Sequence, residues 1–116
     1  MRIYVDVDGT LLDSRLDNLF KEQVARYGIE QAVAWYNGTY IDDLEINYDL
    51  VDALLYYYEM GHELILWTNR GRAQVDMTIK NLEPILWMFS DMIFGEGRKL
   101  KNKPIDGLIV DNEVIG

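Results

Sequence analysis

Two carboxylates, Asp6 and Asp8, stand two positions apart directly after a short apolar run. Residues at this spacing on an extended chain point to the same side, so the two side chains would share one face. Such a pair repels unless a hard cation such as Mg²⁺, which prefers carboxylate oxygens, lies between them. Gly9 lets the backbone turn and a ligand approach, and the Thr10 hydroxyl can bond to nearby backbone groups. The run therefore predicts a cation site at the end of a strand.

Two alternative interpretations apply to the same run. A calcium loop also begins with Asp-x-Asp, but it needs glycine at its sixth position and glutamate at its twelfth. Here glycine is fourth and the twelfth residue is Asp17, so the pattern excludes that loop. A purely structural Asp-x-Asp-Gly-Thr turn stays open as the second interpretation.

Polar side chains also follow three later apolar runs. These are Thr68-Asn69-Arg70, the stretch from Gly95 to Lys99, and Asp111-Asn112-Glu113. In an open parallel sheet the ligand lies beyond the carboxyl ends of the strands, so these groups would meet there. Asp111 would complete an oxygen cage for a cation, which can bridge carboxylate and phosphoryl oxygens. Thr68 and the following N–H groups could hold other phosphate oxygens at a helix N-terminus.

Several basic residues near these strand ends could serve the same site. A lysine between positions 99 and 103 could neutralise charge that builds up on a phosphoryl group in the transition state. Arg70 and Arg72 could reach a substrate phosphate or base, or they could simply begin a solvated helix. Both interpretations stay open for the two arginines.

The elements that must position these groups are short strands alternating with helices. The strand-like runs are Ile3–Val5, Leu64–Trp67, Met92–Phe94 and Leu108–Val110. The helical patterns cover residues 14–28 (Leu16, Leu19, Phe20, Val24 and Tyr27 on one face), Asp49–Met60, Arg72–Leu82 (Val75, Ile79 and Leu82 aligned), and a short turn at Ile85–Phe89. The alternation predicts an α/β fold with an open parallel sheet and right-handed crossovers.

Residues 14–46 are more than a plain crossover needs, so they predict a small helical insertion or lid beside the first strand. The insertion carries Trp35, Tyr36 and Tyr40. These rings either anchor the segment on the core or stack on a nucleobase or sugar.

Composition limits the class of protein. The 116 residues suit one domain, residues 1–116, and 49% of them are apolar, which supports a core. The absence of cysteine excludes disulfides and thiolate sites. The net charge of −9 argues against binding nucleic acid or anionic membranes. An acid as early as Asp6 argues against a signal peptide, and no run approaches a membrane span, so we expect a cytoplasmic protein.

The run Asp6-Val7-Asp8-Gly9-Thr10-Leu11 resembles the first motif of the haloacid dehalogenase superfamily of phosphohydrolases. The resemblance continues along the whole chain, with Thr68 matching the second motif, a lysine before the last strand the third, and Asp111 the fourth. The first motif is specific after an N-terminal strand, whereas the others gain weight from their order. The resemblance implies a Rossmann-like three-layer sandwich with a short parallel sheet in the order 4-1-2-3.

The same resemblance implies roles for these residues. Asp6 attacks phosphorus and becomes an aspartyl-phosphate, and Asp8 acts as general acid and then general base. Mg²⁺ is bound by Asp6, by Asp8 through its backbone carbonyl, and by Asp111. Thr68, Asn69 and a lysine hold the phosphoryl group.

The lysine is chosen by spacing. Lys103, followed by proline, stands eight residues before Asp111, a spacing that small family members often show, so Lys103 is favoured. Lys99 and Lys101 stay open as alternatives.

One departure from the family pattern concerns the metal. The fourth motif often has a second acid after the first, and this chain has Asn112 there; Asn112 or Glu113 could still act through a water. The expected function is a Mg²⁺-dependent phosphatase with little or no cap, acting on a small-molecule phosphate ester such as a nucleotide or sugar phosphate. The alternative is a non-catalytic binding or assembly module on the same fold.

Overall fold

A parallel β-sheet forms the centre of the fold. The computed structural model describes residues 1–111. Within them the strands β1 (Arg2–Val5), β2 (Glu63–Thr68), β3 (Phe89–Phe94) and β4 (Gly107–Val110) make one four-stranded sheet in the order β3-β2-β1-β4. Read from the β4 edge this is β4-β1-β2-β3, so each strand has the neighbours expected above. The α/β class and the all-parallel pairing are confirmed.

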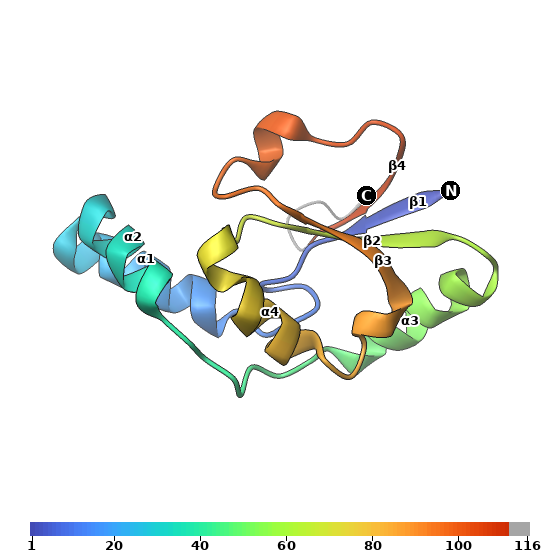
Figure 1. The fold of residues 1–116 in the computed structure, drawn as a ribbon, viewed down its shortest axis with the longest axis horizontal. Helices are drawn as coiled ribbons and strands as arrows, with labels where there is room; N and C mark the ends of the chain where they lie inside the picture. Colours follow the sequence, from blue (N-terminus) through green and yellow to red (C-terminus); the bar gives the residue numbers. More distant parts are fainter. Residues whose placement is uncertain (112–116) are drawn as a thin grey trace.

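Helices cover one face of this sheet. α3 (Tyr48–Glu59) is the last helix of the connection from β1 to β2, and α4 (Val75–Leu82), preceded by the 3₁₀ turn η1 (Arg72–Gln74), connects β2 to β3. Another 3₁₀ turn, η2 (Leu86–Met88), leads into β3. Figure 1 shows α3 and α4 on the same side of the sheet. The chain then returns from β3 to β4 across the opposite side.

The expected three-layer sandwich is therefore incomplete in the described residues. The opposite face carries a loop with a single 3₁₀ turn, η3 (Lys99–Asn102), instead of a helix (Figure 1). Glycines surround the start of this loop, and Glu96 and Gly97 both have positive φ angles, 49° and 80°, which do not continue a helix. The connection is consequently a loop that can fold back toward the ends of β1 and β2.

Buried side chains alternate between the two faces of the sheet along β1 and β2, as the pleat of the strands requires. Ile3 and Leu64 point to the helix face, where they join Leu54 of α3 and Leu82 of α4 in the main apolar cluster. On the opposite face a smaller cluster holds the side chain of Trp67. Both faces of the two central strands are thus buried, and this fixes the positions of the polar residues that follow them.

The inward face of α4 differs from its expected pattern. Ile79, expected inward, is 39% exposed, whereas Thr78 and Asn81 are buried beside Met77. The prediction for Ile79 was wrong because two polar side chains on this helix bind a buried arginine, described below.

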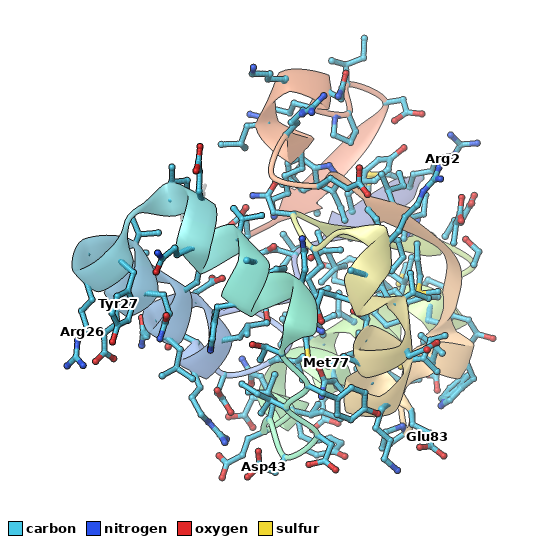
Figure 2. All side chains as sticks on the ribbon, turned by 60° about the vertical axis from the view of Figure 1, so that its left-hand side comes forward. Arg2, Arg26, Tyr27, Asp43, Met77 and Glu83 are labelled. Atoms are coloured by element: carbon cyan, nitrogen blue, oxygen red, sulfur yellow. The ribbon has the colours of Figure 1, made fainter. Side chains whose placement is uncertain are left out.

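The segment after β1 is a helical hairpin. α1 (Arg15–Tyr27) and α2 (Ile29–Gly38) meet at Gly28, which has a φ angle of +85°. The hairpin extends from the carboxyl end of the sheet (Figure 1), and Figure 2 shows Arg26 and Tyr27 at its far tip. Tyr27, expected on the inward face, is 55% exposed because the helix has left the sheet by that point. Between residues 1 and 111, no helix is long and apolar enough to cross a membrane.

Candidate active site

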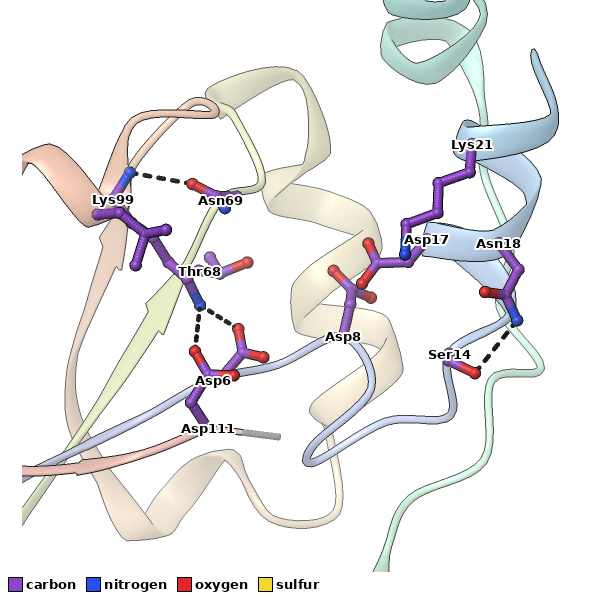
Figure 3. A pocket seen from close by; sticks show the side chains of 11 residues that line it. Asp6, Asp8, Ser14, Asp17, Asn18, Lys21, Thr68, Asn69, Lys99 and Asp111 are labelled. Carbon is purple, nitrogen blue, oxygen red and sulfur yellow. Dashed lines mark hydrogen bonds and ion pairs between the residues drawn. The ribbon is translucent and has the colours of Figure 1, made fainter. Parts of the chain in front are cut away.

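A cleft of about 230 Å³ lies at the carboxyl ends of β1, β2 and β4. Five of the residues expected at the site line it: Asp6, Asp8, Thr68, Asn69 and Asp111. Figure 3 shows them around the end of the sheet, with α1 forming the opposite wall. The parallel register explains the meeting, because Val5 pairs with both Leu66 and Val110 and the residues that follow leave the sheet together.

Asp6 and Asp111 face one ammonium group, that of Lys99. The Lys99 Nζ forms an ion pair with Asp6 and lies 3.6 Å from Oδ2 of Asp111 (Figure 3). Thr10 donates its hydroxyl to the other oxygen of Asp6 at 3.1 Å. Burial raises the pKa of Asp6, although the hydrogen bond and charge of Lys99 act in the opposite direction. The site therefore attracts a positive charge to a point between two carboxylates.

Lys99 reaches this point because of the loop after β3. The backbone N–H groups of Gly95 and Gly97 donate to the carbonyls of Thr68 and Asn69 at 2.7 and 2.8 Å. The Asn69 side chain in turn accepts the N–H of Lys99 at 3.0 Å. These bonds bring Lys99 over the end of β2, where its Nζ lies 4.5 Å from the centre of the Trp67 ring and its side chain is 6% exposed.

This arrangement corrects the choice of lysine. Lys103 is exposed and does not line the cleft, and Lys101 is exposed as well. The spacing to Asp111 favoured Lys103, but the loop folds back at the glycines and attaches at Asn69, several residues earlier. Asn69 lines the cleft as expected, and its side-chain oxygen also positions Lys99.

Asp8 is held by Arg70, for which the sequence left two other interpretations open: contact with a substrate, or a solvated helix start. Arg70 donates Nε and Nη2 to the two carboxylate oxygens of Asp8 at 2.9 and 2.7 Å. Its Nη1 donates to Thr78 at 3.0 Å and to Asn81 at 2.9 Å, and the side chain is fully buried. The planar guanidinium fork matches a carboxylate, so Arg70 fixes the direction of Asp8. Arg70 is thus neither solvated nor free to reach a substrate.

One signal in the sequence could have revealed this network. Thr78 and Asn81 lie three positions apart on one helix, next to the apolar residues Met77 and Leu82. Two polar residues on a buried helix face need a partner, because unpaired buried polar groups are costly. In the structure that partner is Arg70, one of the two arginines that precede the helix.

Thr68 lies at the floor of the cleft. It is 1% exposed, and its hydroxyl accepts the backbone N–H of Arg70 at 3.1 Å. The expected helix N-terminus does not follow directly, because η1 separates Thr68 from the start of α4 at Val75. Thr68 remains beside Asp6 as a hydroxyl that can donate toward the cleft.

The three expected metal ligands, Asp6, Asp8 and Asp111, all line the cleft. No group of three His, Cys, Asp or Glu side chains close enough to hold a metal occurs in residues 1–111. Asp8 binds Arg70 through its carboxylate, which leaves its backbone carbonyl, the group that the resemblance implies. Asp6 and Asp111 fit a Mg²⁺ ion that keeps several waters, since both already face the Lys99 cation. Asn112 and Glu113 lie outside the described residues.

The polar side of α1 also borders the cleft, and its residues were not among those predicted for the site. Asp17, Asn18 and Lys21 line the wall opposite Asp6, with Asp17 directed toward Asp8 in Figure 3. Burial, with the charges of Asp8 and Asp6, raises the pKa of Asp17 to about 6, against smaller opposing effects of Lys21 and Arg70. Their helical spacing along one side of α1 was the available signal.

Comparison of the chain with models of protein families, with curated proteins and with solved structures found no match.

Proposed function

We propose that this protein is a Mg²⁺-dependent phosphatase that hydrolyses a phosphate monoester through an aspartyl-phosphate on Asp6. One observation carries the proposal: Asp6 is buried at the end of β1, shares a cation with Asp111, and borders an open cleft. A carboxylate so placed is a candidate nucleophile, because its surroundings favour a bound cation and so allow an anionic substrate to approach. The expected cytoplasmic location belongs to this proposal.

The proposed hydrolysis has two steps, and both use residues of the cleft. An oxygen of Asp6 forms a bond to phosphorus as the bond to the leaving oxygen breaks, and Asp8 gives that oxygen a proton. Asp8 then takes a proton from a water that attacks phosphorus, which releases phosphate and restores Asp6. Each oxygen of Asp8 keeps a second lone pair beyond its bond to Arg70, so the arginine leaves room for this proton.

The remaining groups stabilise charge. Lys99 and the Thr68 hydroxyl line the cleft beside Asp6 and would donate to the phosphoryl oxygens, with Lys99 transferring hydrogen bonds from Asp6 to them. Asp6, Asp111 and the backbone carbonyl of Asp8 would hold Mg²⁺, whose chemistry is to neutralise phosphoryl charge.

The test is hydrolysis of p-nitrophenyl phosphate with Mg²⁺ or with EDTA. We expect turnover only with Mg²⁺, and a loss of at least about 1000-fold in Asp6→Asn because the nucleophile is gone. Asp52→Asn, an exposed acid on α3, is the matched control and should keep full activity. Metal-independent turnover, or full activity in Asp6→Asn, would contradict the proposal.

A non-catalytic module on the same fold is the second candidate. One observation favours it: the carboxylates of Asp6 and Asp8 are already paired with Lys99 and Arg70 of the same chain. A thermal melt separates the two candidates, because an ion that binds only the native state raises the midpoint. No turnover together with no Mg²⁺-dependent shift of the midpoint would favour the module.

A further inference from the structure

A second, larger cavity of about 580 Å³ adjoins the catalytic cleft. It lies between the α1–α2 hairpin and the loops that follow β2 and β3, and it shares Asp17 and Asn69 with the cleft. The Gln74 side-chain amide donates to the Tyr36 carbonyl, so the hairpin is tied to the turn before α4. A substrate with its phosphate at Asp6 would extend into this cavity past the two shared residues.

The hairpin side of the cavity is apolar and aromatic. It consists of Phe20, Val33 and Tyr36, with the rings of Phe20 and Tyr36 in edge contact at 5.5 Å between centroids. Val33 is 43% exposed, and Phe20 and Tyr36 are half-buried, with Tyr36 also packed against the main core. A partly exposed apolar wall inside a concave site is typical of ligand pockets, and the volume of this cavity falls in their usual range of about 300–1,000 Å³.

Taken together, the charged residues that line the cavity are two acids and one base. Asp17 lies on α1, whereas Glu96 and Arg72 lie on the opposite side, where the backbone N–H of Arg72 donates to Glu96 at 3.3 Å. This balance disfavours a second phosphate or carboxylate on the substrate, because like charges repel. It does offer donors and acceptors to the edge of a neutral ring, and Asn37 adds an amide.

We propose, on the basis of the phosphatase function proposed above, that the substrate is a nucleoside monophosphate whose base occupies this cavity. The base would pack against Phe20 and Val33 and present its polar edge to Glu96 and Arg72. The sugar would pass between Asp17 and Asn69, which border both spaces. Bases stack on aromatic side chains with useful affinity whatever their identity, so one cavity of this kind accepts several bases.

The test compares nucleoside 5′-monophosphates with ribose 5-phosphate, which carries the same phosphate and sugar without a base. We expect kcat/KM with Mg²⁺ to be at least about tenfold higher for a nucleotide. Phe20→Ala should remove this preference. Val33→Trp should remove it as well, because the larger side chain fills the cavity from an exposed position, where it does not disturb the packing of the core. Both variants should leave ribose 5-phosphate hydrolysis unchanged. Ile29→Ala, exposed on the same hairpin and outside the cavity, is the control.

Binding in EDTA gives a second measurement that does not depend on turnover. Calorimetric titration should show at least about tenfold tighter binding of a nucleotide than of ribose 5-phosphate, and Val33→Trp should abolish the difference. Equal kcat/KM and equal binding of the two ligands would overturn the substrate proposal while leaving the phosphatase intact. Selective nucleotide binding without hydrolysis of any ester would instead overturn the phosphatase and keep the cavity as a nucleotide site.

Discussion

Arg70 is the residue whose role depends most on the tertiary structure. Its guanidinium makes four hydrogen bonds, to the carboxylate of Asp8 and to the side chains of Thr78 and Asn81, all in the buried interior. A paired charge that loses its partner inside a protein is expensive, because the remaining ion cannot recover its hydration. The general acid of the proposed mechanism is therefore coupled to the stability of the fold.

This coupling makes a prediction about stability. We expect Arg70→Met, which keeps most of the volume but removes every donor, to lower the free energy of unfolding by about 3 kcal/mol. The double variant Arg70→Met with Asp8→Asn should be less destabilised than the sum of the two single changes, since the unpaired carboxylate is gone. Urea denaturation in EDTA measures both effects. Strictly additive losses would show that the pair does not interact energetically.

Asp17 makes a prediction about pH. Its pKa is raised from 3.8 to about 6 in the folded protein, so the folded state holds the proton more tightly than the unfolded state. The resulting stabilisation is present below about pH 4 and is lost as the pH rises through about 6. We expect Asp17→Asn to raise the free energy of unfolding by about 1 kcal/mol at pH 7 and to leave it unchanged at pH 4. The figure is discounted because Asp17 is partly exposed.

Urea titrations at several pH values in EDTA measure this difference, with Asp52→Asn as the control for loss of a carboxylate. A difference between Asp17→Asn and the native chain that stays constant from pH 4 to pH 7 would show that Asp17 titrates normally in the fold.

At the scale of elements, the loop after β3 determines which lysine enters the cleft. Gly95 lies against the backbone of Lys99, and an added Cβ would come within 2.7 Å of the Lys99 Cβ and 2.8 Å of its N. No side chain fits there without moving the loop. We expect Gly95→Ala to lower Mg²⁺-dependent hydrolysis at least about tenfold, because Lys99 would be displaced from Asp6.

The matched control is Gly38→Ala in α2, where an added Cβ meets nothing within 4 Å. It should leave activity unchanged and should not lower the thermal midpoint, since alanine favours a helix. If Gly95→Ala keeps native activity while its thermal midpoint falls, the glycine serves packing alone and Lys99 is not held by this contact.

The two central strands were predicted closely, whereas β3 begins at Phe89, three residues before the predicted Met92. Short apolar runs bounded by polar residues mark buried parallel strands, so the runs at Ile3 and Leu64 located β1 and β2 to within a residue or so. The prediction for α4 was poorer, because periodicity assumes that apolar side chains define the buried face. In α4 that face includes Thr78 and Asn81, whose burial depends on Arg70, a residue outside the helix.

For the whole molecule, the parallel register placed the predicted carboxylates together without further information. Asp6 and Asp111 each follow a strand, and paired parallel strands end at the same edge, so sequence position alone implied their proximity. The choice among Lys99, Lys101 and Lys103 depended on where a loop folds back, which spacing does not encode. The aromatic cavity likewise required the position of the hairpin relative to the sheet.

Net charge also has a consequence at this scale. The chain carries −9, yet the buried cations Lys99 and Arg70 are both concentrated beside the carboxylates of the cleft. These cations offset part of the negative charge of Asp6, Asp8 and Asp111, and the proposed Mg²⁺ would offset more, which the approach of a phosphate ester requires.

Trapping of a phosphoenzyme tests the central claim most directly. The protein is mixed with Mg²⁺ and an aryl phosphate carrying radiolabelled phosphorus, quenched in acid, and assayed for label bound to the chain. We predict label that is stable in acid, released by hydroxylamine as an acyl phosphate should be, and absent in Asp6→Asn. It should accumulate in Asp8→Asn, because an activated leaving group needs no acid whereas the second step still needs a base. Metal-dependent turnover without any such label, or equal labelling of Asp6→Asn, would contradict the assignment of Asp6 as the nucleophile.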